Sequence, residues 1–166
     1  MRICPFLLIL FSPIASSRAQ KQLSDTFEKF NNNTVAYVSA EELDSAEDII
    51  LLDTRQKKEF DVSHLKHAIW VGYDNFDIDN IHKKAPDKEA PVVVYCSIGV
   101  RSEDIGEKLI SLGYTNVKNL YGGIFEWKNK GYSVYYTNGA KTEKVHAYSK
   151  FWGVLLTNAK KIYSTK

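Results

Sequence analysis

Short, continuous apolar runs alternate with stretches of helical pattern along this chain. The clearest run is Val92–Tyr95, and residues 49–52 (I-I-L-L) form a second one. Apolar runs without polar alternation are typical of strands that are buried on both faces. Such strands, separated by helices, imply a parallel sheet that helices cover on both sides. The pattern therefore predicts an α/β fold.

Local signals place the other elements. Ser39 and Glu42 form a capping box that starts a helix. The polar lead-in of residues 20–33 contains one short helix, for which Ser24 is the expected cap. Strands are expected at residues 35–38, 49–52, 68–71, 92–95 and 117–120. Further helices are expected at residues 75–84, 102–112 and 122–130.

Residues 1–19 have the features of a cleaved signal peptide. A positive start is followed by an apolar run over residues 3–11, and the small residues Ser17 and Ala19 suit cleavage after Ala19. Cleavage after Ser17 is nearly as suitable. The apolar run is about half as long as the roughly 20 residues that a membrane-spanning anchor needs. We therefore expect an exported protein, either periplasmic or secreted.

Export would leave Cys96 as the only cysteine, because Cys4 lies in the removed segment. One cysteine cannot form an internal disulfide, and a lone thiol in an oxidising compartment is a liability unless it has a chemical role. An inert buried cysteine is the alternative. The formal net charge of +2 is too small to indicate a nucleic-acid partner.

Cys96 opens the segment that follows the clearest predicted strand, C-S-I-G-V-R at residues 96–101. In open α/β sheets, ligands bind beyond the carboxyl ends of the strands, where this segment lies. Gly99 permits the positive φ that a tight curl requires, and such a curl turns backbone N–H groups toward an anion. Ser102 is expected to cap the following helix, and Arg101 adds a positive charge. Each of these features favours the thiolate form of Cys96.

Three motifs resemble the signatures of the rhodanese family and follow one another in the family's order. They lie in a domain that we place at residues 34–137. The loop C-S-I-G-V-R-S at residues 96–102 resembles the family's active-site loop. The other two motifs are L-L-D-T-R at 51–55, with E-F at 59–60 and S-H-L at 63–65, and L-Y-G-G-I at 120–124. Ser63 and His67 stand where the family usually has glycine, so the turn between them departs from the pattern.

The resemblance implies a mostly parallel five-stranded sheet and a sulfurtransferase that needs no cofactor. Cys96 would be the catalytic nucleophile, which takes a sulfane sulfur from a donor such as thiosulfate or a persulfide. It would pass this sulfur to a thiophilic acceptor such as cyanide or a thiol. Arg101 would bind the anionic part of the donor. The loop backbone would hold the persulfide through Ser97, Ile98, Gly99 and Val100. The alternative is a non-enzymatic binding or sulfur-carrier module of a larger system.

Other residues near the loop bear on its chemistry. Cysteine phosphatases of related architecture use Cys-x5-Arg, whereas this chain has Cys-x4-Arg, which favours sulfur transfer. Asp53 and Arg55 follow a predicted strand, either as electrostatic support for the site or as an ordinary ion pair that fixes the fold. His64 and His67 have the spacing of a metal-binding pair, but no other ligands cluster with them, so no metal is expected.

Residues 138–166 lie beyond the resemblance and carry a net charge of +5, from six lysines and one glutamate. Apolar residues recur at three- and four-residue steps from Val145 to Ile162, which predicts an amphipathic helix that Thr142 could cap. A helix of this kind needs an apolar partner. The domain itself is the expected partner, and a homodimer contact or a membrane surface is the alternative.

Overall fold

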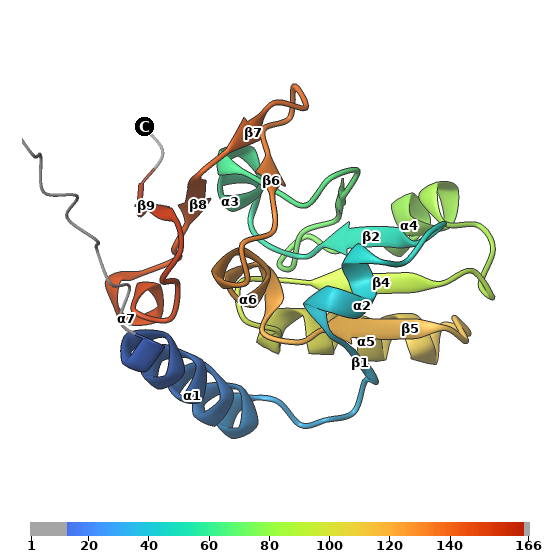
Figure 1. The fold of residues 1–166 in the computed structure, drawn as a ribbon. Coiled ribbons are helices and arrows are strands. Elements are labelled where there is room, and N and C mark those ends of the chain that lie inside the picture. Colours follow the sequence, from blue (N-terminus) through green and yellow to red (C-terminus); the bar gives the residue numbers. More distant parts are fainter. Residues whose placement is uncertain (1–12, 165–166) are drawn as a thin grey trace, which may run out of the picture.

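The computed structural model describes residues 13–164 (Figure 1). The main sheet contains β1 (Tyr37–Val38), β2 (Ile50–Asp53), β3 (Ile69–Trp70), β4 (Val92–Tyr95) and β5 (Val117–Leu120). Its helices are α2 (Ala40–Asp44), α3 (Lys57–Val62), α4 (Ile78–Lys84), α5 (Val100–Ser111) and α6 (Gly123–Asn129). Helix α1 (Pro13–Phe30) precedes the sheet. Strand β6 (Val134–Tyr135) ends the domain, and the C-terminal extension after it contains β7 (Lys141–Thr142), β8 (Lys144–His146), α7 (Lys150–Gly153) and β9 (Lys160–Ile162).

The main sheet has the strand order β1-β5-β4-β2-β3, and every neighbouring pair is parallel. Strand β4 is therefore central. Asp53, the last residue of β2, pairs with Tyr95, the last residue of β4, so these two strands end at the same level. This arrangement confirms the predicted five-stranded α/β fold. It also places the segment after β4 at the middle of the sheet's carboxyl edge.

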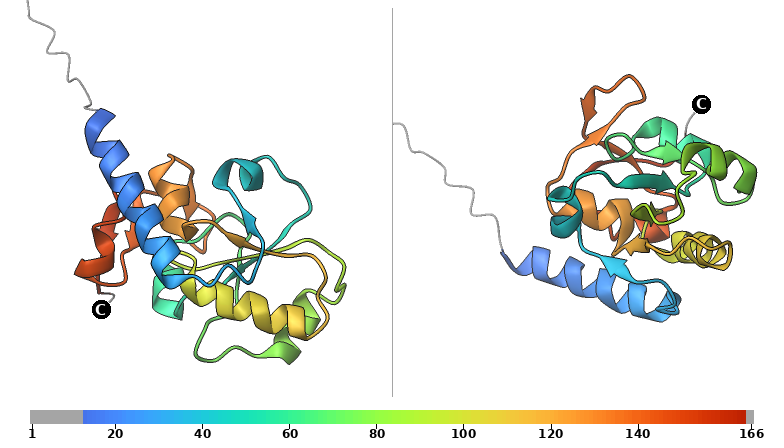
Figure 2. Two further views of the ribbon diagram at one scale, coloured as in Figure 1. Left: turned by 90° about the horizontal axis from the view of Figure 1, so that it is seen from below. Right: turned by 90° about the vertical axis from the view of Figure 1, so that its right-hand side faces the viewer.

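The side chains of β4 alternate between two halves of the core. Val93 and Tyr95 pack in a cluster with residues of α2 and α6, whereas Val92 and Val94 pack with residues of α4 and α5. All four side chains are buried, which explains why this strand has no polar alternation. Helices thus cover the sheet on both faces (Figure 2).

Helix α5 begins two residues earlier than predicted. Its N-cap is Gly99, in the left-handed region with φ of 102°, and not Ser102. The expectation that Ser102 caps this helix is wrong, because Ser102 lies inside the helix and its hydroxyl donates to Asn119 Oδ1 at 2.8 Å. The positive φ predicted for Gly99 is confirmed. Helix α3 was not predicted, since a helix of six residues has too little periodicity to be detected.

The lead-in is helical, as expected, but α1 begins at Pro13, so Ser24 lies inside the helix and does not cap it. Good helix formers such as Ala19 and Gln22 continue the helical pattern upstream of Ser24. The predicted cleavage after Ala19 falls within α1, and residues 1–12 of the predicted signal peptide lie outside the described residues. No helix in residues 13–164 is long and apolar enough to span a bilayer.

The predicted C-terminal amphipathic helix is wrong. In the extension, β7 pairs antiparallel with β6, β8 pairs parallel with β9, and only one four-residue helix forms, α7. Thr142 lies in β7 and caps no helix, and Ser149 caps α7 with a hydroxyl that accepts a hydrogen bond from the Trp152 N–H. The left-handed φ of Tyr148, 61°, interrupts any continuous helix at this point.

The apolar side chains of the extension do pack on the domain. Val145, Leu155 and Leu156 are at most 2% exposed and belong to the same core cluster as Phe125 of α6. Leu155 lies in the turn after α7 and Leu156 directly follows it, so both enter this cluster from outside a continuous helix. Tertiary packing therefore overrides the helical spacing of these residues. The helical face on which the membrane and homodimer expectations rested does not form.

Candidate active site

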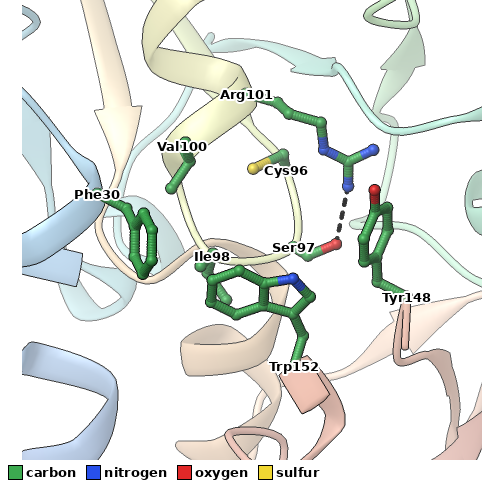
Figure 3. A pocket seen from close by; sticks show the side chains of 8 residues that line it. All are labelled: Phe30, Cys96, Ser97, Ile98, Val100, Arg101, Tyr148 and Trp152. Atoms are coloured by element: carbon green, nitrogen blue, oxygen red, sulfur yellow. Dashed lines mark hydrogen bonds between the residues drawn. The ribbon is translucent and has the colours of Figure 1, made fainter. Parts of the chain in front are cut away.

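Cys96 directly follows the central strand β4 and is 1% exposed. The loop of residues 96–99 curls around its sulfur (Figure 3). The backbone N–H of Gly99 donates a hydrogen bond to Cys96 Sγ, with an N–S distance of 3.2 Å. Helix α5 starts at the next residue, Val100, so its positively polarised end is also at this loop. The fold thus brings Gly99 and the start of α5 to the Cys96 sulfur, as the sequence predicted.

Helix α6 binds the loop through backbone hydrogen bonds. The backbone N–H groups of Ile124 and Phe125 donate to the carbonyl oxygens of Cys96 and Ser97, at 3.0 and 3.1 Å. Gly123 is essential to this approach, because a Cβ at this position would lie 2.4 Å from the Cys96 carbonyl oxygen. Gly123 of the L-Y-G-G-I motif therefore allows α6 to meet the loop directly.

Asn119 of β5 supports the loop from the neighbouring strand. Its Nδ2 donates to the Gly99 carbonyl oxygen at 2.8 Å, and its Oδ1 accepts the hydrogen bond from Ser102. Ser102 thus supports the loop through Asn119, although it does not cap the helix. The sequence reasoning missed Asn119. A polar residue at a buried position of a strand was the available signal.

Arg101 forms a bidentate ion pair with Glu59 of α3. The guanidinium donates to Glu59 Oε2 at 2.8 Å and to Oε1 at 3.0 Å, and also to Ser97 Oγ at 3.0 Å. The Glu59 side chain is 0% exposed and that of Arg101 is 18% exposed. Glu59 was quoted in the first sequence motif but was not identified as a site residue. Only the fold brings α3 against the loop.

Opposing effects act on the charges of this pair. Burial alone would raise the pKa of Glu59, but the hydrogen bonds and charge of Arg101 outweigh it and hold the pKa below its ordinary value. Burial likewise works against the charged form of Arg101, yet Glu59 raises the pKa of this guanidinium above its ordinary value. Both groups are therefore charged at neutral pH, and much of the positive charge of Arg101 is balanced within the pair.

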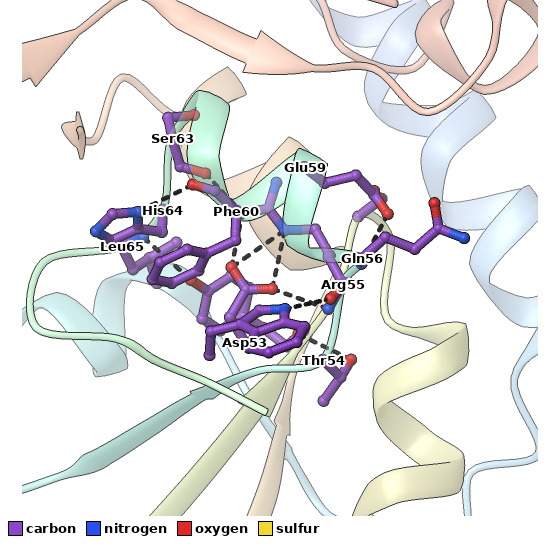
Figure 4. A network of polar contacts seen from close by, with 12 residues as sticks. Asp53, Thr54, Arg55, Gln56, Glu59, Phe60, Ser63, His64 and Leu65 are labelled. Atoms are coloured by element: carbon purple, nitrogen blue, oxygen red, sulfur yellow. Dashed lines mark hydrogen bonds and ion pairs between the residues drawn. The ribbon is translucent and has the colours of Figure 1, made fainter. Parts of the chain in front are cut away.

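Asp53 and Arg55 form a second ion pair, in which both side chains are 0% exposed (Figure 4). Arg55 Nη2 lies 2.6 Å from Asp53 Oδ2 and donates to the Ser63 carbonyl oxygen at 2.7 Å. Their contacts join the end of β2 to the end of α3. This geometry matches the ordinary ion pair that fixes the fold, which was one of the two expected roles.

The turn that departs from the family pattern contains one residue in the left-handed region. His67 has a φ of 61°, in the left-handed region where a glycine is usual. His64 stacks on the Phe60 ring at 3.9 Å between ring centroids. Among the described residues, no three His, Cys, Asp or Glu side chains gather in a way that could hold a metal ion.

A cavity of about 170 Å³ opens above Cys96. The loop supplies part of its lining, through Cys96, Ser97, Ile98, Val100 and Arg101. Three aromatic side chains complete it, namely Phe30 of α1 and Tyr148 and Trp152 of the extension (Figure 3). Sequence reasoning did not place these aromatic residues at the site, because they are far from the loop in sequence.

His146 lies in β8, which packs against α3, and is 1% exposed. Its Nδ1 accepts a hydrogen bond from the Tyr148 N–H at 3.1 Å, whereas its Nε2 has no hydrogen-bond partner among the described residues. Burial lowers the pKa of His146 below its ordinary value, and the nearby Glu59 carboxylate offsets only part of this effect. The imidazole is therefore neutral in the folded protein at pH 7.

We predict that the free energy of unfolding decreases as the pH falls below about 6.5. Since His146 binds a proton less readily when folded, the unfolded chain takes up more protons in this range and is favoured. One titrating group sets a slope of at most about 1.4 kcal/mol per pH unit. Urea unfolding between pH 7.5 and 5.5 would measure it. His146→Asn should reduce the slope, because the asparagine side chain does not titrate in this range. Equal slopes in wild type and His146→Asn would contradict the assignment.

The fold and the loop together define a class of protein. It is an α/β protein in which a cysteine loop at the carboxyl end of the central parallel strand precedes a helix. The family model of the Rhodanese-like domain matches residues 36–130, more than half of the chain. The chain therefore belongs to the rhodanese-like domain family, and its homologues include named sulfurtransferases.

Relatives show how this domain is used elsewhere. Thiosulfate sulfurtransferase GlpE of Coxiella burnetii is 31% identical over 94 residues, which are 57% of this chain and 85% of the relative. Adenylyltransferase and sulfurtransferase UBA4 of Candida albicans is 35% identical over 85 residues, 48% of this chain. These residues are only 19% of that longer protein.

Solved structures show the same fold. A thiosulfate sulfurtransferase from Pseudomonas aeruginosa superposes with a TM-score of 0.56 at 23% identity, over 76% of this chain and 23% of that one. A rhodanese-related protein from Thermoplasma volcanium superposes with a TM-score of 0.52 at 25% identity, over 60% of this chain and 96% of that one. Both comparisons support the rhodanese-like α/β architecture.

Proposed function

We propose that this protein is a sulfurtransferase that carries a sulfane sulfur as a persulfide on Cys96. One observation carries the proposal: Cys96 Sγ lies inside a curled loop, accepts the Gly99 N–H and borders a cavity. Donors of this kind stabilise a sulfur anion, whether it is the thiolate or the persulfide. Membership of the rhodanese-like family and the named sulfurtransferase GlpE agree with this chemistry.

The proposed reaction has two steps. The Cys96 thiolate attacks the sulfane sulfur of a donor, an S–S bond forms, and the leaving group departs with the electron pair of the broken bond. If thiosulfate is the donor, the leaving group is sulfite. A nucleophilic acceptor then attacks the terminal sulfur, and the Cys96 thiolate is regenerated. With cyanide as acceptor, the product is thiocyanate. Covalent catalysis of this type gives ping-pong kinetics.

Glu59 and Arg101 have complementary parts in this proposal. Arg101 faces the cavity and contacts Ser97, so it is the group that would meet the anionic part of a donor. Glu59 is completely buried behind it and fixes both of its terminal nitrogens. A bidentate pair restricts a guanidinium to one orientation. Glu59 is therefore a positioning residue, and Arg101 is the proposed donor-binding residue.

Loading the purified protein tests the function. Incubation with a sulfane-sulfur donor should add about 32 Da to the intact mass, because one sulfur atom joins Cys96. Subsequent cyanide should return the mass to its starting value and release one thiocyanate per loaded protein. Mass spectrometry and colorimetric thiocyanate detection would follow both steps. A protein that reacts with the donor but gains no cyanide-labile sulfur would contradict the proposal.

A sulfur-carrier module is a second candidate. The relative UBA4 contains the matching domain as a small part of a larger protein, which favours this alternative. A carrier would load and unload sulfur once but would turn over slowly with free donor and acceptor. Steady-state turnover well above one thiocyanate per protein would favour the enzyme, and a single release without turnover would favour the carrier.

We also propose export, on the composition of residues 2–19. Expression of the full chain in a bacterial host should yield a mature protein that begins at Gln20, or at Arg18 if cleavage follows Ser17. Such cleavage would retain Phe27, which contacts Tyr37 of the domain, and Phe30, which contacts Trp152 of the C-terminal extension. N-terminal sequencing of the protein from the periplasm or medium checks this. An intact Met1 on cytosolic protein would contradict it.

A further inference from the structure

We propose that the cavity above Cys96 selects an organic sulfur substrate that carries an apolar, preferably aromatic, group and no more than one negative charge. The inorganic thiosulfate dianion would be a poor donor by comparison. This inference rests on the proposed function and adds the class of substrate. It depends on three properties of the cavity: its aromatic wall, the support of that wall, and its charge.

The wall is aromatic and comes from outside the matched domain. Phe30, Tyr148 and Trp152 lie before or after residues 36–130, the part that the family model matches. The Phe30 and Trp152 rings meet edge to face, with 5.4 Å between their centroids. Phe30 and Tyr148 remain 43% and 45% exposed beside the loop. Aromatic rings that stay accessible around a reactive sulfur offer an apolar group a place to bind.

Both segments that carry this wall are firmly attached. Phe27, one helical turn before Phe30, is 2% exposed and packs on Tyr121 with 4.3 Å between ring centroids. On the other side, Leu155 and Leu156 follow Trp152 and insert into the core. Figure 2 shows α1 beside the extension. The wall is thus part of the folded structure and needs no ligand to form.

The charge of the cavity disfavours a dianion. Among the side chains that line it in the described part of the chain, Arg101 is the only basic one, and none is a carboxylate. Both terminal nitrogens of Arg101 are already bound to Glu59. The Cys96 thiolate adds a further negative charge. Arg101 can therefore meet one negative charge of a donor, but the described lining offers no second basic side chain for another.

Apolar side chains of the loop also favour an apolar substrate group at the base of the cavity. Ile98 is 5% exposed and Val100 is half-buried, and both line the space beside Cys96. The Arg101 guanidinium lies over the Tyr148 ring, with 5.0 Å from Cζ to the centroid, so the ring covers one side of the guanidinium. An organic thiosulfonate or persulfide with an aromatic group fits these surroundings, with its sulfur directed at Cys96.

Thiosulfonates are sulfur donors that can test this inference, and their reaction with Cys96 has a defined leaving group. The Cys96 thiolate attacks the terminal sulfur of R–SO₂–S⁻, the Cys96 S–S bond forms, and the sulfinate R–SO₂⁻ leaves with the electron pair. Cyanide then removes the sulfur as thiocyanate. Benzenethiosulfonate and methanethiosulfonate each carry one charge, whereas thiosulfate carries two. Comparing benzenethiosulfonate with methanethiosulfonate therefore measures the effect of the aromatic group. Comparing methanethiosulfonate with thiosulfate measures the effect of the second negative charge.

The experiment compares kcat/KM for the three donors with cyanide as acceptor. Each value is divided by the rate at which the same donor reacts with free cysteine, which corrects for the leaving group. In wild type, benzenethiosulfonate should exceed methanethiosulfonate by at least about tenfold, which corresponds to about 1.4 kcal/mol. Thiosulfate should be the poorest donor. Trp152→Ala and, as an independent variant, Phe30→Ala should each reduce the benzene-to-methane ratio by at least about threefold.

Val154→Ala is the matched control, because Val154 directly follows α7, is 52% exposed and does not line the cavity. It should leave the ratio unchanged. A wild-type ratio near one, or a ratio that neither aromatic variant lowers, would overturn the inference. If Cys96→Ser turned over the same donors as wild type, the proposed function itself would fail. Turnover that depends on Cys96 but shows no selectivity would reject only the substrate class.

Discussion

Replacing Cys96 with serine should reduce sulfur transfer by at least about 10³-fold, the scale of loss when a covalent nucleophile is removed. Serine oxygen is far less nucleophilic than a thiolate and cannot form a persulfide. Its hydroxyl can still accept the hydrogen bond that Gly99 donates to Cys96 Sγ, so the loop should keep its shape. Thiocyanate production and intact mass after loading would measure the effect.

The fold of this variant must be checked separately. The side chain is 1% exposed and differs from serine in one atom, so the melting temperature should change by only a few degrees. A folded Cys96→Ser protein that still gains a cyanide-labile sulfur would show that another group carries it. Loss of both activity and folding would instead indicate that Cys96 is a structural residue. In that case Cys96→Ala should also fail to fold.

Replacing Asp53 with asparagine should lower the free energy of unfolding by about 3–5 kcal/mol. Both members of the Asp53–Arg55 pair are completely buried, so the variant would leave the Arg55 charge without its partner. An isolated charge in the interior is far more costly than an unpaired charge in water. Urea unfolding at pH 7, followed by circular dichroism, would measure the loss.

Asp61→Asn is the matched control. Asp61 pairs with Lys57 on the surface of α3, and their side chains are 46% and 53% exposed. Solvent screens such pairs, so this change should cost no more than about 0.5 kcal/mol. If both variants lost the same small amount, the buried pair would be less important for the fold than its geometry indicates. A large loss confined to Asp53→Asn would support the structural role.

The segments outside the matched domain supply part of the lining of the cavity beside Cys96. Phe30 of α1 and Trp152 of α7 meet above the loop, although they are 122 positions apart in the sequence. Neither belongs to residues 36–130. Relatives that share only the central domain could thus share the cysteine loop and differ in the substrates that reach it. The proposed selectivity is a property of these added segments.

Much of the fold was predictable because its signals are local. Each strand of the main sheet was expected within a few residues of its observed position, since continuous apolar runs report burial on both faces. The capping box at Ser39 and Glu42 was confirmed, because both of its hydrogen bonds lie within four residues. The position of Cys96 after β4 followed from the order of the elements. The conformation of Gly99 followed from the lack of a Cβ in glycine.

The tertiary structure decided the features that depend on distant partners. Glu59 meets Arg101 across 42 residues, and Asn119 meets Gly99 across 20, so no local pattern identified them as parts of the site. The tail had the spacing of a helix, but it folds into two strand pairs and the short helix α7, and these place Leu155 and Leu156 in the core of the domain. Contacts with the domain outweigh helical spacing here, because a helix of this kind is marginal without an apolar partner. The sequence by itself thus determined the α/β sheet and the cysteine loop. The tertiary structure decided what surrounds the sulfur, because contacts between distant segments form only when the chain is folded.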